Sequence, residues 1–564
     1  MKQTSMITIE EIQNFKGKYP KQLWYLALVE MWERFTFYGM RALLALYIAT
    51  LALTTDYNPI SSEELERVKI EFKNKNGEEL TESHPMYILE TSQAKFKSDA
   101  EAKSNKQYGL IQAFIYAMAF VGGLFADKLF GARKSVFWGG LLMAIGTFVM
   151  AVPGALFFYI GVSILIVGNG FFKPNISTMV GALYKPGDAR KDAGFSLFYM
   201  SINVGALLSG LTIAWVGTSV SWSLGFASAG VCMLMGLGLF LFTQKKLGPV
   251  GLPSNPELLK EKKFGLNKDL FYRLVSLLFI PFFLLMIYYP IDVNMTWLLG
   301  TATGVDGGAI QNLVAFSDLF MMVVAVAILV YLARTLFTVS KEEFGKMFVA
   351  IVLILFSVLF FSFFEQGGGS LNFFATQNVE NHGLNMTQVN NSINPLWVIV
   401  MAPILGALWI ALSKRNKEPN AIVKFGSGFI LLGFGFFIFY LSRSLATTTG
   451  LVPLSMFMGG YLGLTIGELC LSPIGLSMVT SLTPKRIHGV MMGTWFLASA
   501  YGQYGAGLIG SMLAKVDHTI DNPTNWDKLV QYTDGYYSIA IVSAIAGVVL
   551  LLLAPALTKV MKRK

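Results

Sequence analysis

Long apolar runs alternate with short polar loops along nearly the whole chain. A helix of about 20 apolar residues spans the hydrocarbon core of a bilayer, and most of these runs are about that long. The pattern therefore predicts an all-α polytopic membrane protein with about 14 transmembrane helices. The predicted spans lie near residues 23–50, 108–128, 135–153, 155–184, 194–214, 221–243, 270–293, 312–333, 344–368, 395–412, 422–442, 452–480, 488–513 and 536–558.

Positively charged residues are concentrated in the loops on one side of this array. Lys and Arg are concentrated in loops 128–134, 185–191, 245–268, 334–346, 414–424, 485–488 and 559–564. The connections near 214–220, 294–311 and 370–394 contain neither residue. Because loops rich in Lys and Arg stay in the cytoplasm, the alternation predicts that both termini are cytoplasmic.

The composition agrees with a membrane protein. Apolar residues make up 54% of the chain and charged residues 14%, against about 25% charged residues in average soluble domains. The net charge of +10 does not indicate nucleic-acid binding, because the basic residues lie in short loops between spans. The cysteines Cys232 and Cys470 lie inside apolar runs and predict neither a disulfide nor a metal site.

Two segments interrupt the helical array. Residues 53–107 form a polar excursion, in which Asn76-Gly77 is expected to be the turn of a β-hairpin. The spans near 270–293 and 312–333 have few polar residues and are expected to form an accessory helical hairpin that faces lipid. The expected division is an N-terminal segment 1–22, a six-helix bundle 23–243, a linker with the accessory hairpin 244–343, a second six-helix bundle 344–558 and a basic tail 559–564.

The first span carries four ionisable residues, Glu30, Glu33, Arg34 and Arg41. At 100° per residue they fall within about 100° of arc on one helix face. Each charge inside a membrane costs about 3 kcal/mol on insertion scales. A soluble amphipathic helix or a purely structural ion pair are the alternatives, but two acids with two bases exceed what a structural pair needs. The stripe predicts a path for protons or a charged solute.

The sequence lacks the signatures of an enzyme or of a nucleotide-driven pump. It contains no Gly-rich phosphate loop ending in Gly-Lys-Ser/Thr, no metal-ligand spacing and no Ser/His/Asp arrangement. No cofactor is therefore expected. A secondary transporter driven by an ion gradient is the class that remains.

Residues 123–134, Gly-Leu-Phe-Ala-Asp-Lys-Leu-Phe-Gly-Ala-Arg-Lys, resemble a loop signature of the major facilitator superfamily. The glycines allow two helices to approach closely, and Asp127 is placed near a helix N-terminus, where it can pair with a base. The resemblance implies a major facilitator fold of two six-helix bundles. It also implies that Asp127 and Arg133 form a conformational latch.

The segment Glu30-Met-Trp-Glu33-Arg34-Phe-Thr-Phe37-Tyr38-Gly resembles the Glu-x-x-Glu-Arg-Phe-x-Tyr-Tyr-Gly signature of the proton-dependent oligopeptide transporter family. Further matches, in the order of the family, are Phe172-Lys173-Pro174-Asn175, residues 195–206, Phe364-Glu365-Gln366, Asn394-Pro395, residues 467–473 and Met492-Gly493-Thr494-Trp495. The resemblance covers nearly all of the membrane portion, but not residues 53–107. It implies symport of protons with dipeptides and tripeptides by alternating access. Bacterial members also carry an extra helical pair, so a bacterial inner membrane is the expected location.

A zwitterionic peptide needs an anion site and a cation site near the middle of the membrane. Arg41 and Lys173 are expected to receive the peptide carboxylate, and Glu468 in the second half the ammonium group. Ion pairing of Lys173 with an acid of the first span, or helix-to-helix hydrogen bonding by Glu468, stay open as alternatives. Six further residues at positions matching the family's pocket are expected to hold the rest of the peptide: Tyr38, Tyr116, Asn203, Asn394, Ser472 and Trp495. For Trp495 an ordinary packed aromatic is the alternative.

Proton coupling needs an acid whose surroundings change with the state of the bundles. Glu30 and Glu33, beside Arg34 and facing Lys173, are expected to exchange ion pairs for protons. Glu365 is expected to form a second titrating gate, with a structural helix cap as the alternative.

Two positions depart from the family pattern, since Phe37 and Phe361 stand where Tyr and Trp are usual, and both bear on substrate range. A transporter of another charged solute remains an alternative function. A membrane sensor that uses residues 53–107 to bind a partner is a further alternative. No nucleic acid or obligate protein partner is expected.

Overall fold

The computed structural model describes residues 7–55, 57–185, 188, 190–253, 256–259, 261–289, 291–295, 302–303, 309–310, 313–483, 488–515 and 523–562. Some side chains within these ranges are not described, among them those of residues 472–474, 476–481 and 488–490.

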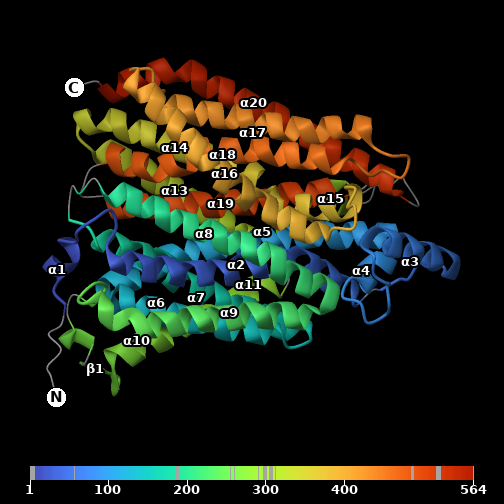
Figure 1. Ribbon diagram of the computed structural model, residues 1–564, viewed down its shortest axis with the longest axis horizontal. Helices are drawn as coiled ribbons and strands as arrows, with labels where there is room; N and C mark the ends of the chain where they lie inside the picture. Colours follow the sequence, from blue (N-terminus) through green and yellow to red (C-terminus); the bar gives the residue numbers. More distant parts are fainter. Residues whose placement is uncertain are drawn as a thin grey trace.

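The N-terminal half is a bundle of long helices (Figure 1). Its helices are α2 (Lys21–Leu53), α5 (Ala94–Phe125), α6 (Gly131–Met150), α7 (Ala155–Ala182), α8 (Arg190–Trp215) and α9 (Trp222–Thr243), with π-helical turns η1 (Ala126–Phe130) after α5 and η2 (Val216–Val220) after α8. Small residues let the helices pack closely: a Cβ atom at Gly122 of α5 would lie 2.1 Å from the carbonyl oxygen of Gly170 in α7.

The C-terminal half is a second bundle, stacked on the first in Figure 1. Its first helix breaks at a Gly-rich turn that begins at Glu365. The elements are α14 (Lys341–Phe364), the turn η5 (Glu365–Gly368), α15 (Ser370–Asn378), α16 (Met386–Lys414), α17 (Ala421–Ser442), η6 (Arg443–Leu445), α18 (Leu454–Leu482), α19 (His488–Ala514) and α20 (Asn525–Lys562).

Along the chain, the linker and the accessory helices connect the two halves. Short elements occupy the linker: η3 (Gln244–Leu247), η4 (Glu257–Leu259), β1 (Lys262–Lys263) and β2 (Leu266–Asn267). The accessory pair is α10 (Lys268–Leu277) with α11 (Phe279–Ile287), and α13 (Phe316–Thr338). Three antiparallel strand pairs occur among the described residues: β1 with β2, β3 (Asp292–Asn294) with β6 (Leu313–Ala315), and β4 (Ala302–Thr303) with β5 (Ala309–Ile310).

The described residues contain 12 helical runs that are long and apolar enough to cross a membrane. One of these runs, Ala94–Met150, contains two of the predicted spans, while α19 covers a predicted span that is not among the 12. The prediction of an all-α polytopic membrane protein is confirmed.

The hairpin expected around Asn76-Gly77 is wrong. Residues 62–76 form a helix instead, α3 (Ser62–Asn76), and a short helix α4 (Tyr87–Thr91) follows. Gly77 ends α3 in the left-handed conformation, at φ 73°. The second long helix, α5, begins at Ala94, well before the expected residue 108.

The molecule has two distinct ends. Figure 1 places both termini and the short helix α1 (Ile9–Gln13) at one end, and α3 and α4 at the opposite end. We refer to these as the termini end and the α3 end. Helices α2, α5 and α7 run between them and position the charged groups described below.

Candidate functional site

The acid–base stripe of α2 forms a buried cluster inside the N-terminal half. Arg34 donates from Nη2 to Oε1 of Glu33 over 2.7 Å and makes a second, shorter contact from Nε to the same carboxylate. The Nε atom also lies 3.1 Å from Oε1 of Glu30. All three side chains are almost completely buried. One guanidinium thus joins both acids, and Oε2 of Glu30 is buried without a hydrogen-bond partner among the described residues.

Helix α7 supplies another partner to this cluster. The amide nitrogen Nδ2 of Asn169 donates to Oε1 of Glu33 over 3.0 Å. The Asn169 side chain is fully buried, and its Oδ1 atom has no hydrogen-bond partner among the described residues.

Lys173 lies one helical turn after Asn169. Its ammonium nitrogen lies 4.1 Å from the centre of the Tyr116 ring, which is a cation–π contact. No described carboxylate lies within 4.0 Å of this nitrogen. The open alternative of an ion pair between Lys173 and a first-span acid is therefore not the arrangement in this conformation.

Arg41 connects the two halves of the protein. Its guanidinium pairs with Glu365 of η5, and its Nε donates to the Tyr108 hydroxyl of α5 over 2.5 Å. The partly buried pair joins α2 to the break in the first helix of the C-terminal half. Arg41 and Glu365, expected from the sequence in separate roles, share one contact.

Glu468 of α18 is a second ionisable group without an ion-pair partner among the described residues. Its Oε2 accepts a hydrogen bond of 3.1 Å from Nδ2 of Asn394, which also donates to the Thr465 hydroxyl over 3.0 Å. None of the described Lys, Arg or His side chains forms an ion pair with Glu468. The structure thus brings together Glu468 and Asn394, both expected to contact the peptide. Their hydrogen bond joins α18 to α16, which is also the helix-to-helix contact left open as the alternative for Glu468.

Tyr38 lies near charged groups of both halves. Its hydroxyl is within electrostatic range of Arg41 and of Glu365 and Glu468 from the other half. Tyr116 is within range of the Arg41–Glu365 pair and of Tyr38. The charges on facing halves therefore surround a common region.

The remaining predicted site residues have mixed surroundings. Asn203 donates to the backbone carbonyl of Tyr199 in its own helix, over 3.0 Å. Trp495 packs on α18, since a Cβ atom at Gly475 would lie 2.0 Å from its ring. The side chain of Ser472 lies outside the described residues. Asn203 and Trp495, like the other residues expected to contact the peptide, remain predictions in that role.

The two predicted latch residues do not meet. Arg133 donates from Nη2 to the carbonyl oxygens of Gly248 and Val250, each over 2.7 Å, and so holds the linker against the N-terminal half. Asp127 lies exposed in η1, and no described basic side chain forms an ion pair with it. The expected pairing of Asp127 with a base is not found in this conformation.

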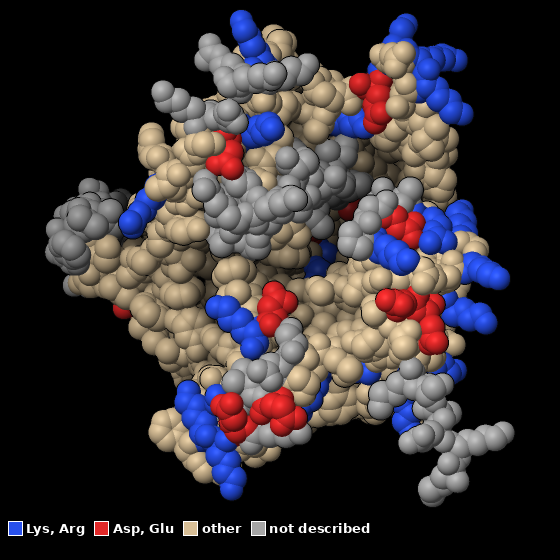
Figure 2. Space-filling model, turned by 90° about the vertical axis from the view of Figure 1, so that its left-hand side faces the viewer, with Lys and Arg blue, Asp and Glu red and all other residues tan. Residues whose placement is uncertain are grey.

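The halves are joined closely at the α3 end. Gly109 of α5 abuts Gly507 of α19, where a Cβ atom would lie 2.5 Å from the facing Cα. On the other side, a Cβ atom at Gly210 of α8 would lie 2.5 Å from the Ser392 hydroxyl of α16. Figure 2 shows the termini end, whose surface is hollowed near its centre and has Lys and Arg side chains around its rim. The arrangement is closed at the α3 end.

Two members of this site were missed by the sequence analysis, namely Asn169 and Tyr108. Asn169 precedes Lys173 by four residues and so shares its helix face, and Tyr108 precedes Tyr116 by eight. That spacing was the available signal. No group of three or more His, Cys, Asp or Glu side chains suited to a metal ion occurs within the described part of the chain.

Comparisons with known proteins agree with this geometry. Residues 133–526 match the sequence model of the POT family. The "Dipeptide and tripeptide permease A" of Erwinia pyrifoliae is 29% identical over 96% of this chain and 95% of the relative. The "Peptide transporter YePEPT" of Yersinia enterocolitica is 31% identical over 95% of this chain and 94% of the relative. A crystal structure of "peptide transporter POT in complex with sulfate" is 27% identical, covers 99% of this chain and 100% of its own, and has a TM-score of 0.73. This likeness confirms the predicted major facilitator fold.

Proposed function

We propose that this chain, which belongs to the POT family, imports dipeptides and tripeptides together with protons. The chain is a membrane transporter and not an enzyme. One observation supports a zwitterionic substrate above others: among the described residues, the Lys173 amine in one half and the Glu468 carboxyl group in the other each lack an ion-pair partner.

A peptide with free ends satisfies both charges at once. Its carboxylate would bind the Lys173 ammonium group, and its own ammonium group the Glu468 carboxylate. An unpaired charge is costly to remove from water, so pairing with both ends of the peptide would draw the two halves together around it. Arg41 is held by Glu365 in this conformation and would reach the carboxylate only after that pair opens.

Protons would enter through the acids of α2. Glu33 and Glu30 share Arg34 as their partner. Protonation of one acid would weaken its bond to Arg34, so that the guanidinium could bind the other acid more strongly. The Arg41–Glu365 pair would form a second proton-sensitive contact, because a protonated Glu365 no longer attracts Arg41. The proton gradient then drives uptake, and no cofactor is needed.

The proposed orientation places both termini in the cytoplasm of a bacterial cell, in the inner membrane. Lys and Arg side chains around the rim of the termini end support this orientation (Figure 2). The closed α3 end would then face outward, and the hollowed end the cytoplasm. Exposed apolar side chains of α13, including Met322 and Val326, suit contact with lipid.

Uptake by purified protein in proteoliposomes tests the function. An inward proton gradient should drive accumulation of a labelled dipeptide, and unlabelled dipeptides and tripeptides should compete. Free amino acids and unrelated charged solutes should compete weakly. Accumulation that is indifferent to the proton gradient, or that only a non-peptide solute inhibits, would contradict the proposal.

Substitution Glu468→Gln tests the orientation of the peptide. N-acetylated dipeptide leaves the Glu468 carboxylate without its cation, at a cost of about 2–5 kcal/mol. The unmodified protein should therefore prefer the free dipeptide by about 30-fold or more. In the variant this preference should shrink to a few-fold, although the free peptide also binds less tightly. Competition for labelled uptake, or thermal shift with each peptide, measures the ratio. A ratio that the substitution leaves unchanged places the ammonium group elsewhere.

A further inference from the structure

Asn169 is the one uncharged side chain that we find hydrogen-bonded to the carboxylate of Glu33 in the described structure. Its Nδ2 donates to Glu33 over 3.0 Å, while its own Oδ1 is buried without a partner. The side-chain amide of Asn carries a donor NH2 group and an acceptor oxygen at equivalent positions on the same carbon. Turning the amide over would therefore present Oδ1 where Nδ2 now lies.

We propose that Asn169 is a positioning residue for proton exchange at Glu33. It donates to Glu33 while that acid is ionised, and it accepts from Glu33 once the acid is protonated. The inference rests on the proposed proton coupling. A Lys or Arg at this place could not accept a hydrogen bond from the acid, whereas the amide serves both states.

The charged groups around Glu33 do not provide a neutral hydrogen-bonding partner, which Asn169 does. Arg34 binds the same carboxylate and also contacts Glu30. Lys173, on the helix of Asn169, lies against Tyr116 rather than on Glu33. Arg34 and Lys173 supply positive charge, while Asn169 holds the carboxyl group in one place without adding charge.

The variants Asn169→Leu and Asn169→Asp test this role through the pH profile of uptake. With leucine, the ionised acid loses a charge-assisted hydrogen bond, and the protonated acid loses only a weaker neutral one. With aspartate, two adjacent carboxyls cannot both be ionised, so one proton is held to higher pH. Both variants should shift the pH midpoint of uptake to the alkaline side, by about 0.5 to 1 unit for leucine.

A matched control is Ser163→Ala, a buried side chain of the same helix whose one hydrogen bond among the described residues goes to the Tyr159 carbonyl. Its pH midpoint should equal that of the unmodified protein. Peptide exchange without a gradient should stay near normal in the Asn169 variants. Lower uptake at every pH with an unmoved midpoint in both variants would overturn the inference. Loss of proton dependence in the unmodified protein would instead overturn the proposed function.

A second inference concerns the segment between α2 and α5, which we call the strap and define as residues 57–93. The strap is attached to the N-terminal half. The Trp222 indole donates to the Pro85 carbonyl over 2.9 Å, and the hydroxyls of Tyr57 and Thr91 lie 2.6 Å apart at its base. The strap therefore moves with the N-terminal half.

The tip of the strap reaches the C-terminal half. Lys75 of α3 donates from Nζ to the Thr376 carbonyl over 2.6 Å. Asn381 donates back to the Lys75 carbonyl and, over 3.2 Å, to Oδ1 of Asn76. Thr376 lies in the last turn of α15, where carbonyl groups lack helical partners and a cation is stabilised. Lys75 is therefore held at a helix C-terminus of the opposite half.

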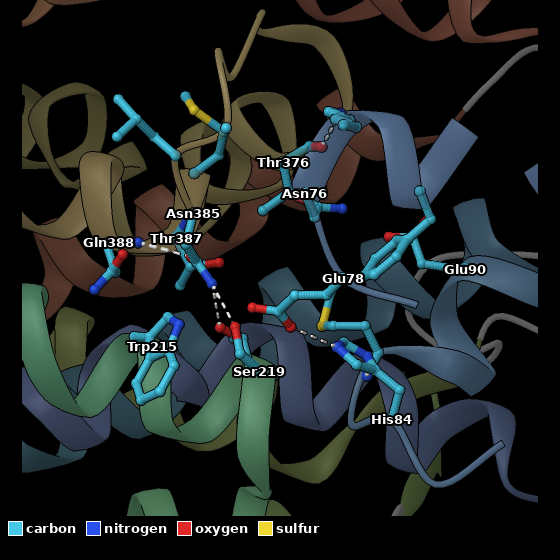
Figure 3. Close-up of a pocket in the computed structure, with 17 residues that line it drawn as sticks. Asn76, Glu78, His84, Glu90, Trp215, Ser219, Thr376, Asn385, Thr387 and Gln388 are labelled. Atoms are coloured by element: carbon cyan, nitrogen blue, oxygen red, sulfur yellow. Dashed lines mark hydrogen bonds and ion pairs between the residues drawn. The ribbon is translucent and has the colours of Figure 1, made fainter. Parts of the chain in front are cut away.

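Next to these contacts, a cavity lies between the strap and parts of both halves (Figure 3). It is lined by Glu78, His84 and Glu90 from the strap, Ser219 from η2 and Asn385 before α16. Burial lowers the pKa of Lys75, while the nearby acids Glu90 and Glu71 oppose this effect and Lys97 adds to it. The Lys75 ammonium is thus partly desolvated and depends on the α15 carbonyls for compensation.

We infer that the strap is a latch that keeps the α3 end closed and detaches from α15 when this end opens. The inference rests on transport by alternating access, in which the halves separate at one end at a time. Because the strap is fixed to one half and hydrogen-bonded to the other, its contacts cannot survive that separation. The strap therefore sets part of the free-energy difference between the two states.

Cross-linking tests the latch. In a Cys232→Ser, Cys470→Ser background, the pair Asn76→Cys and Asn381→Cys joins the strap to the C-terminal half. A short bifunctional thiol reagent should abolish uptake, and the unreacted double variant should transport. The control pair Tyr57→Cys and Thr91→Cys joins two parts of the strap base within one half, and its reaction should leave uptake intact. Full uptake after complete reaction of the Asn76–Asn381 pair would overturn the latch.

Accessibility gives a second test that does not depend on the substrate. Ser392→Cys places a thiol in the closed contact between α16 and α8. Adding Lys75→Met removes the charge and the hydrogen-bond donor but keeps an unbranched side chain of similar size, so a membrane-impermeant thiol reagent should react several-fold faster. Lys69→Met, on the exposed face of the same helix, is the control and should leave the rate unchanged. Equal rates in the Lys75 and Lys69 variants would also contradict the latch.

Discussion

Replacement of Lys173 with alanine is expected to abolish gradient-driven peptide uptake while the protein remains folded. The Lys173 ammonium group is partly buried, lies on the Tyr116 ring and has no described carboxylate within 4.0 Å. Such a charge does not stabilise the resting structure, so its removal should leave the melting temperature equal or higher. Its expected partner is the peptide carboxylate, and losing one member of a buried charge pair costs about 2–5 kcal/mol. Uptake should fall at least about 30-fold.

The measurement is dipeptide accumulation in proteoliposomes, with melting temperature and gel filtration as checks on folding. Lys185→Ala is a matched control, because that lysine lies just beyond the same helix and donates to Asn14 at the surface. The control should transport normally. Near-normal accumulation by a folded Lys173→Ala protein would show that neither coupling nor peptide binding needs this charge.

The helical architecture could be predicted from the sequence because each span is dictated locally by its apolar length. The break after Phe364 was also visible, since glycines follow Glu365 directly. The error at residues 62–77 arose from a competition between two local signals. Asn-Gly is typical of a hairpin turn, but Gly also ends helices. Ser61 as an N-cap and Lys75 in the last turn favour the helix.

The charged residues that the structure gathers near the two halves' contact could be named from the sequence, but not the partner of each one. Arg41 pairs with Glu365, a residue 324 positions away, and this contact depends on how the halves dock. Lys173 faces a ring rather than an acid for the same reason. Helical spacing gives the face of a side chain, whereas its partner is set by tertiary packing and by the conformational state.

The Arg41–Glu365 pair shows how the conformational state of the two halves affects the proposed function. It bridges the halves near their closed end, next to Tyr108 and the break in the helix at Gly368. A carboxylate from an incoming peptide would compete with Glu365 for the same guanidinium. In the proposed mechanism the pair would therefore take part both in closure and in binding, roles that the sequence suggests for different residues.

Glu33→Gln is expected to uncouple transport from the proton gradient without unfolding the protein. The glutamine amide has nearly the shape of the protonated acid and can still hydrogen-bond to Arg34 and Asn169. The variant should therefore remain in the proton-loaded form, in which peptide crosses but the proton cannot be released. Exchange between equal peptide pools should stay near the normal rate, while accumulation against a gradient falls to background. Glu66→Gln, an exposed acid on α3, is the control and should change neither rate. If exchange and accumulation decline together in Glu33→Gln, the residue holds the structure or the peptide and does not carry the proton.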